Sequence, residues 1–147
     1  MTKRSASEKL KRLDEYIHAL LRRFYVRPSL EGAAAELSGS EIFACNILGR
    51  KGKCTMSDLA KECGLALSSM TGVVDRLVER RYVKRARDDR EDRRKVFVEL
   101  DTKGQKAYQQ LLEGEMEMII TVMDSLKPAE QDALLGVLGK AVGALQR

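Results

Sequence analysis

The sequence predicts a mainly α-helical protein with one small β-hairpin. Apolar residues recur at helical spacing over most of the 147 residues, and Ser, Thr and Gly caps separate the helical segments. One strand pair interrupts this pattern. Its second strand alternates between Val96, Val98 and Leu100 on one side and Phe97 and Glu99 on the other, which is the period of a β-strand.

Two helices are expected before the middle of the chain. The first covers about residues 8–27, where six apolar residues share one face, and Pro28 ends it. The second begins at a capping box in which Ser38 caps the helix and Glu41 reaches back to it, and it closes at Gly52.

The next two helices form a helix-turn-helix pattern. A short helix begins after Thr55, and Gly64 supplies the left-handed residue of a sharp turn. The following helix is expected from Leu67 to about Arg81. Its core face takes the apolar residues at positions i, i+3, i+4 and i+7, which are Met70, Val73, Val74 and Leu77.

The excess positive charge lies in one segment. The chain carries 27 Lys/Arg against 22 Asp/Glu, and residues 76–95 alone carry ten Lys/Arg against five Asp/Glu, so both net charges are +5. A cationic hairpin beside a helix with an exposed polar face is typical of a nucleic-acid-binding surface. The order of elements over about residues 38–100 therefore predicts a winged helix-turn-helix that binds double-stranded DNA.

Candidate DNA contacts fall into two groups. In the recognition helix, short side chains near its start can reach base edges and a longer one can reach guanine or phosphate; these residues are Leu67, Ser68, Ser69, Thr71, Gly72 and Arg76. In the hairpin, cationic side chains can contact phosphates; these are Arg87, Arg90, Arg93, Arg94 and Lys95. Acidic residues among the hairpin cations predict that several cations are paired. The alternative for the helix is that the serines only cap it and that Arg76 pairs with Glu79.

The terminal helices carry more apolar surface than a small winged domain can bury. A long helix follows Asp101, which can cap it, and a last helix begins at Pro128, so helices cover about residues 102–146. Together with residues 8–27, their apolar faces predict a two-fold homodimer. The alternative is that they complete the core of a monomer.

Several stretches of this sequence carry a family resemblance. They are Asp58-Leu59-Ala60, Gly64, Val74-Asp75-Arg76-Leu77, Asp92-Arg93-Arg94, and Leu100 to Gly104. Taken together, they resemble the MarR (multiple-antibiotic-resistance regulator) family, and the likeness covers nearly the whole chain as a single domain over residues 1–147.

The resemblance implies a dimeric transcription regulator that binds a pseudo-palindromic operator. It further implies that Asp92 and Arg94 form a pair that stiffens the hairpin, and that Arg90 or Arg93 enters the minor groove. On family grounds, repression is expected rather than activation.

Three positions depart from the family pattern. Ala66 stands where Ser or Thr usually caps the recognition helix, so the cap is lost or moves to Ser68. Arg81 stands where a helix-ending Gly is common, and Asp101 replaces a Thr but caps equally well.

The resemblance also implies a small-molecule effector. Many members of the family bind small aromatic acids or phenols in a cleft between the dimer helices and the winged domain, and the ligand shifts the dimer between two states. The candidates on the first helix are Tyr16, His18, Arg22 and Tyr25. For His18, an ordinary surface or interface histidine is the alternative.

Other classes receive less support. Cys45, Cys54 and Cys63 form no Cys-x-x-Cys pair and only one histidine is present, so we expect buried thiols and no metal site, although a redox- or metal-gated regulator remains an alternative. The sequence offers no nucleophile–base set and no glycine-rich phosphate loop, so neither an enzyme nor a cofactor is expected. After the effector-responsive regulator and the redox- or metal-gated regulator, a winged-helix protein-interaction module without DNA binding is the third hypothesis.

No apolar run approaches the roughly 20 residues of a membrane span and no secretory signal is apparent, so we expect a cytoplasmic protein with no membrane partner.

Overall fold

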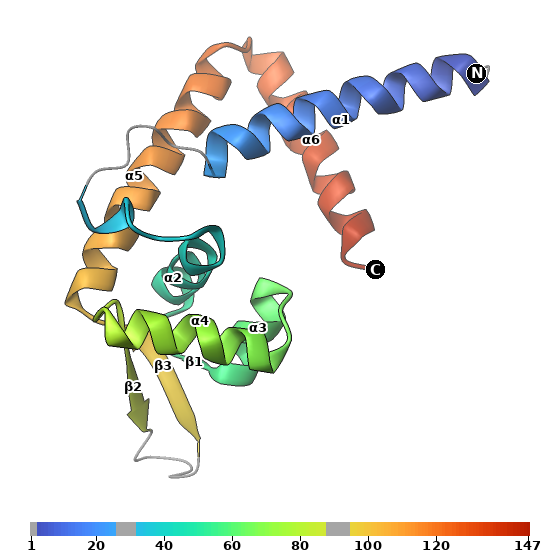
Figure 1. Ribbon diagram of the computed structural model, residues 1–147. Helices are drawn as coiled ribbons and strands as arrows, with labels where there is room; N and C mark the ends of the chain where they lie inside the picture. The colour runs from blue at the N-terminus through green and yellow to red at the C-terminus, as the bar shows by residue number, and fades with distance from the viewer. Residues whose placement is uncertain (1–2, 26–31, 88–94) are drawn as a thin grey trace. The chain divides into compact units, whose positions relative to one another are not determined.

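The computed structural model describes residues 3–25, 32–87 and 95–147 and confirms the mainly helical class. The elements in chain order (Figure 1) are α1 (Lys3–Tyr25), the 3-10 helix η1 (Gly32–Ala34), α2 (Gly39–Lys51), β1 (Cys54–Thr55), α3 (Met56–Cys63), α4 (Leu67–Glu79), β2 (Val83–Arg87), β3 (Val96–Leu100), α5 (Thr102–Asp124) and α6 (Pro128–Leu145). The chain divides into two compact units, Met1–Leu111 and Leu112–Arg147. Within the described residues, no helix is both long and apolar enough to cross a membrane.

The local signals for the helix-turn-helix are confirmed. At the start of α2, the Ser38 hydroxyl accepts the Glu41 N–H, and the Glu41 carboxylate accepts the Ser38 N–H at 2.9 Å. The Thr55 hydroxyl accepts the Asp58 N–H at 3.1 Å and so caps α3. Gly64 ends α3 with φ of 65°, the left-handed conformation that favours glycine. These bonds fix where the two helices begin and how the chain turns between them.

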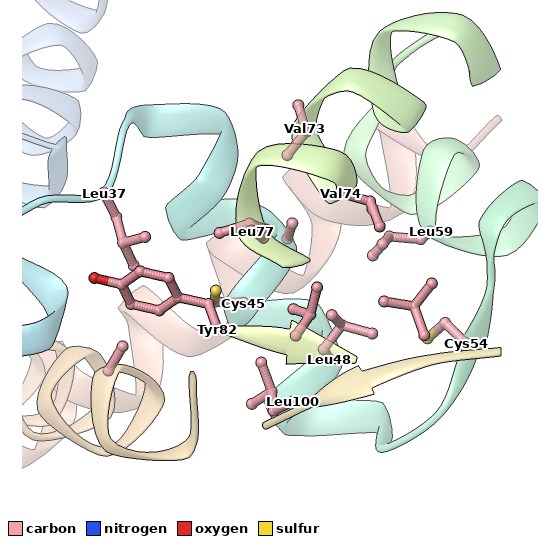
Figure 2. Close-up of a cluster of buried hydrophobic side chains, with 14 of the residues drawn as sticks. Leu37, Cys45, Leu48, Cys54, Leu59, Val73, Val74, Leu77, Tyr82 and Leu100 are labelled. Carbon is pink, nitrogen blue, oxygen red and sulfur yellow. The ribbon is translucent and has the colours of Figure 1, made fainter. Parts of the chain in front are cut away.

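A shared core holds α4 in place. Its predicted inner face (Met70, Val73, Val74 and Leu77) is buried. Figure 2 shows Val74 of α4 pointing toward Leu59 of α3, with Leu48 of α2 nearby. Each such side chain contributes about 1.5–3 kcal/mol when fully buried. The four inward residues therefore hold α4 in the core and leave its opposite face exposed.

The sheet has three strands in the order β1-β3-β2, and both pairs are antiparallel. The hairpin was predicted, and Val98 and Leu100 point into the core as expected. The edge strand β1 was not predicted, because two residues are too few to show a strand period. It pairs Cys54 with Val98 and thereby joins the start of α3 to the hairpin.

Two helix boundaries differ from the prediction. The first helix begins at Lys3 rather than near residue 8, because the polar residues before its apolar face are compatible with helix. The recognition helix α4 ends at Glu79 rather than Arg81. Arg81 adopts φ of 64°, so it occupies the left-handed position for which the resemblance implies glycine.

A close backbone contact explains Gly104, the last residue of the Leu100 to Gly104 stretch that carries the family resemblance. Tyr82 is fully buried and its hydroxyl donates to the Ala33 carbonyl at 2.5 Å. The Tyr82 carbonyl accepts the Asp101 N–H at 2.9 Å, just before α5 begins. A Cβ added to Gly104 would lie 1.9 Å from that carbonyl oxygen. Only glycine therefore lets α5 begin this close to the corner between α4 and β2.

The second unit contains the C-terminal half of α5 and all of α6. The Gln131 amide donates to the Met123 carbonyl at 2.8 Å and to the Leu126 carbonyl at 3.3 Å, which fixes the turn between the helices. Pro128 occupies the first turn of α6, as predicted. Large apolar side chains of this unit remain exposed in the single chain; they include Met116, Ile120, Leu135, Leu138, Val142 and Leu145.

We expect Gly104→Ala to destabilise the protein by about 3 kcal/mol or more, because the added methyl group overlaps a backbone oxygen that cannot move freely. Gly136→Ala in α6 is the matched control, since no atom lies within 4 Å of its added Cβ and helix propensity favours Ala by about 0.5–1 kcal/mol. Urea unfolding of both variants measures the difference. Equal midpoints for the two would contradict the close contact.

Candidate nucleic-acid interface

The exposed face of α4 carries the predicted recognition residues. Leu67, Ser68, Ser69 and Thr71 are exposed, Gly72 is half-buried, and Arg76 is exposed one turn further along. Leu67 is apolar and yet 52% exposed at the first position of the helix. Since Ser68, Gly72 and Arg76 are separated by four residues each, they form a single row along the helix surface.

The start of α4 has no side-chain cap. Ala66 is the N-cap residue, with φ of −65° and ψ of 150°, and it makes no capping hydrogen bond. The predicted loss of the cap is therefore confirmed. The first N–H groups of a helix lack partners within the helix and carry partial positive charge, which favours an anion at this position.

Thr71 differs from the two serines in its hydrogen bonding. Its hydroxyl donates to the Leu67 carbonyl at 2.9 Å, one turn back along α4. The hydroxyl proton is thus used within the helix, while the oxygen lone pairs and the methyl group remain exposed.

Arg76 pairs with a carboxylate that the sequence analysis did not assign to it. We expected Glu79 as the alternative partner, but the Arg76 Nε lies 3.8 Å from Oε2 of Glu41 in α2. The same oxygen accepts a hydrogen bond from Arg80 Nη2 at 2.5 Å. Only 5% of the Glu41 side chain is exposed. Burial alone would raise the pKa of Glu41, but hydrogen bonds from the Ser38 backbone and from Arg80 outweigh burial and lower it, so the carboxylate stays charged.

Part of the hairpin charge is neutralised within the protein. Lys84 of β2 faces Glu99 of β3 across the strand pair, with Nζ and Oε1 3.7 Å apart. Arg85 of β2 donates to the carboxylate of Asp75 and thereby ties the hairpin to α4. Both partners lie outside the acidic run on which the pairing prediction rested, and that run belongs to residues 88–94, outside the described residues, so the prediction for the run itself stays a prediction.

The two described members of the predicted hairpin contacts lie at the outer ends of the strands. Arg87 ends β2, Lys95 precedes β3, and both are exposed. The remaining hairpin residues proposed for DNA contact or for stiffening the hairpin, which are Arg90, Asp92, Arg93 and Arg94, lie outside the described residues. Their roles stay predictions.

Sequence reasoning missed the anchoring role of Glu41. The capping box explained why Glu41 stands at the start of α2, and nothing in the sequence suggested a second role for it. Its partners Arg76 and Arg80 are 35 and 39 positions later in the chain, so no local spacing connects them. The Asp75–Arg85 pair was missed for the same reason, since it joins a helix to a strand.

The effector candidates do not all lie on one side of α1. Tyr16 and His18 are two residues apart, so their side chains leave the helix on opposite sides, whereas His18 and Arg22 share a face. The Tyr16 hydroxyl accepts a hydrogen bond from Arg12 at 3.1 Å. The side chain of Tyr25 lies outside the described residues.

The three cysteines are free thiols in different degrees of burial. Cys45 and Cys54 are buried, as predicted, and Cys63 is half-buried. Burial raises the pKa of all three, and it raises the pKa of Cys45 to about 12. These thiols are protonated near neutral pH and are poor nucleophiles. The described part of the chain contains no group of three or more His, Cys, Asp or Glu side chains placed to hold a metal ion.

Comparison with known sequences decides the family. The sequence profile of the MarR family matches residues 37–95, the region of the helix-turn-helix and hairpin. An HTH-type transcriptional regulator of Bacillus subtilis, YcgE, is 30% identical over 149 aligned positions, which cover 99% of this chain and 94% of the relative. The chain belongs to the MarR family. A second B. subtilis relative, the transcriptional repressor YetL, is 34% identical over 56% of this chain and 49% of its own length.

Solved structures have the same fold as this MarR-family chain. Streptococcus pneumoniae FabT, solved in complex with DNA, matches with a TM-score of 0.75 at 22% identity, over 93% of this chain and 94% of FabT. NadR, solved in complex with 4-hydroxyphenylacetate, matches with a TM-score of 0.68 at 25% identity, over 88% of each chain. Both matches extend beyond the helix-turn-helix over most of each chain.

Proposed function

We propose that this protein is a dimeric transcription repressor that binds a pseudo-palindromic operator and leaves it when a small aromatic effector binds. The observation that carries the proposal is the exposed row of α4 beside a cationic hairpin. Residues 76–95 carry a net charge of +5 and the rest of the chain sums to zero, so one segment accounts for the whole excess. Membership in a family of DNA-binding regulators supports the same conclusion.

In the proposed complex, α4 enters the major groove and the hairpin follows the backbone beside it. Ser68 and Ser69 are short, exposed and near the start of α4, so they are placed to meet base edges. Leu67 offers an apolar contact for a thymine methyl group. Arg76, Arg87 and Lys95 supply charge for phosphates, with Arg90, Arg93 and Arg94 completing the proposed set. FabT, which shares the fold, was solved with DNA, and this supports the use of the fold.

The homodimer is supported by apolar faces that the single chain leaves exposed. On α1 these residues are Leu10, Leu13, Tyr16, Ile17, Leu20 and Leu21. On α6, Leu135, Leu138, Val142 and Leu145 recur at helical spacing on one face. Faces of this size rarely remain in water, and a second copy of the chain covers them in the simplest way. Two copies would present two α4 helices to two half-sites.

A repressor role is supported by the relative YetL, which is described as a transcriptional repressor. Effector release is supported by NadR, which was solved with 4-hydroxyphenylacetate. His18 and Arg22 share a face of α1 and suit a carboxylate, while Tyr16 on the opposite side suits the dimer face instead.

We expect 4-hydroxyphenylacetate at millimolar concentration to lower operator affinity, and Arg22→Ala to abolish that effect. Unchanged binding of wild type would exclude this compound.

Selection of bound sites from a random duplex pool, sequenced at two salt concentrations, tests the function as a whole. We expect an enriched inverted repeat with half-sites about one helical turn apart, bound more weakly as salt rises. Without enrichment, and with weak binding that vanishes in moderate salt, the DNA-binding regulator would give way to a protein-interaction module.

We expect Leu138→Glu to convert the dimer into a monomer and to weaken operator binding by about 100-fold. In a monomer, binding of one α4 helix to its half-site no longer brings a second α4 helix to the other half-site. Light scattering and operator titration measure the two effects. Lys140→Glu is the matched control, since it introduces the same carboxylate on the same helix at a position that is already polar. A dimeric Leu138→Glu variant would contradict the proposed interface.

A further inference from the structure

We propose that Glu41 is a positioning residue for DNA recognition, because its buried carboxylate holds the guanidinium of Arg76 in place on the exposed face of α4. The inference rests on the proposed DNA-binding function and assigns to it a residue that does not itself touch DNA. It is carried by three features: a fixed carboxylate, an unequal sharing of that carboxylate, and the position of the Arg76 guanidinium over Gly72.

The Glu41 carboxylate is fixed at both oxygens. Oε1 accepts the Ser38 N–H at 2.9 Å, and Oε2 accepts Arg80 Nη2 at 2.5 Å. The first bond forms one half of the capping box of α2, so the side chain cannot leave without breaking that half. Because the side chain is also buried, its negative charge is held in one position between α2 and α4.

Two arginines share this carboxylate unequally. Arg80 makes the close bond, donates a second hydrogen bond to the Glu36 carbonyl at 3.2 Å, and lies over the Tyr82 ring at 5.3 Å. Its guanidinium is thus committed to the fold. Arg76 approaches the same oxygen with Nε at 3.8 Å, which is an ion-pair distance longer than a hydrogen bond, and 57% of its side chain is exposed. One carboxylate cannot neutralise two guanidinium groups, so the surplus positive charge belongs to Arg76.

The guanidinium of Arg76 lies back along the helix, over Gly72. A Cβ added to Gly72 would lie 3.6 Å from Arg76 Nη1, which places that nitrogen one turn closer to the start of α4 than its own Cα. This is the direction of Ser68 in the same row. The Nε edge faces Glu41, and the Nη atoms form the fork that binds phosphate or guanine in two parallel hydrogen bonds. An open hollow of about 400 Å³, lined by Ser38, Glu41, Arg76, Glu79 and Arg80, leaves space around the group.

Positioning matters because an unrestrained arginine loses rotamer freedom when it binds DNA. A guanidinium already held through Nε loses less, so the fork binds its target more tightly. Glu41 therefore assists DNA binding although it is an acid, and although removing it would raise the net charge of the surface.

The test is a double-mutant cycle on operator binding with Glu41→Gln, Arg76→Ala and the combined variant, each checked for thermal stability. We expect Arg76→Ala to weaken binding roughly tenfold, and Glu41→Gln to weaken it severalfold in wild type but not in the Arg76→Ala background. An equal loss in both backgrounds would mean that Glu41 acts through Arg80 and the fold, which would overturn the proposal.

A second variant keeps the test decisive if Glu41→Gln unfolds. Arg76→Lys retains the charge at an exposed site but has neither the Nε donor nor the fork, so we expect most of the Arg76→Ala loss. A lysine that binds as well as arginine would overturn the positioning role. Lys106→Ala on α5 is the control for removing one positive charge, and its affinity should stay close to that of wild type.

The same titrations separate the targets and the hypotheses. A phosphate contact predicts a uniform loss across operator variants and a salt slope smaller by about 0.9, whereas a guanine contact predicts loss of preference at one base pair. If wild type selects no operator, the proposed function itself fails. If wild type binds its operator and Arg76→Ala binds equally well, only the inference about Glu41 fails.

Discussion

The buried Tyr82 side chain is the contact on which the winged helix-turn-helix depends. Its hydroxyl donates to Ala33 before α2, and its backbone carbonyl accepts the N–H of Asp101 before α5. Its ring lies under two cations, with Lys103 Nζ at 4.5 Å and the Arg80 guanidinium at 5.3 Å from its centre. Cation–π contacts of this kind add to the burial of a large aromatic group. One residue therefore connects the segment before α2, the end of α4, the hairpin and the start of α5.

The position of α4 follows from this corner and from two ion pairs. The chain leaves α4 at Glu79, passes through Arg80 and the left-handed Arg81, and enters β2 directly after Tyr82. Glu41 holds the end of α4 to α2, and Asp75 holds its middle to Arg85 of the hairpin. A helix and a hairpin that read one duplex must keep a fixed spacing. In this protein, that spacing is set by polar contacts at the surface as well as by the apolar core beneath α4.

Local chemistry made much of this structure predictable. The Ser38 and Thr55 caps, the turn at Gly64 and the buried face of α4 each depend on residues within one or two helical turns, so a sequence displays them directly. The strand β1 and the Glu41–Arg76 contact depend on pairings between distant segments, which no local period reveals. Tyr16 and His18 illustrate a different limit of reading residue types alone. Their residue types suggested a common pocket, although the helical period alone separates them.

The charge pattern predicts a candidate interface as a region but does not show the use of each cation. Counting cannot distinguish Lys84 and Arg85, which serve the fold, from Arg76, whose charge is only partly neutralised. That distinction depends on where the carboxylates of Glu41, Asp75 and Glu99 lie in space. Among the described cations of this segment, Arg80, Lys84 and Arg85 are therefore paired within the fold and are less available to a ligand.

The uncapped start of α4 places folding and function in competition for the same atoms. A serine at position 66 would satisfy an N–H group that Ala66 leaves open, and such a cap stabilises a helix by about 1 kcal/mol. The hydroxyl would then occupy the donors that an anionic ligand needs. The free protein is thus less stable by about that amount than it would be with a serine cap. In the proposed DNA complex, an anion bound at this helix start would supply on binding the stability that the chain does not gain on folding.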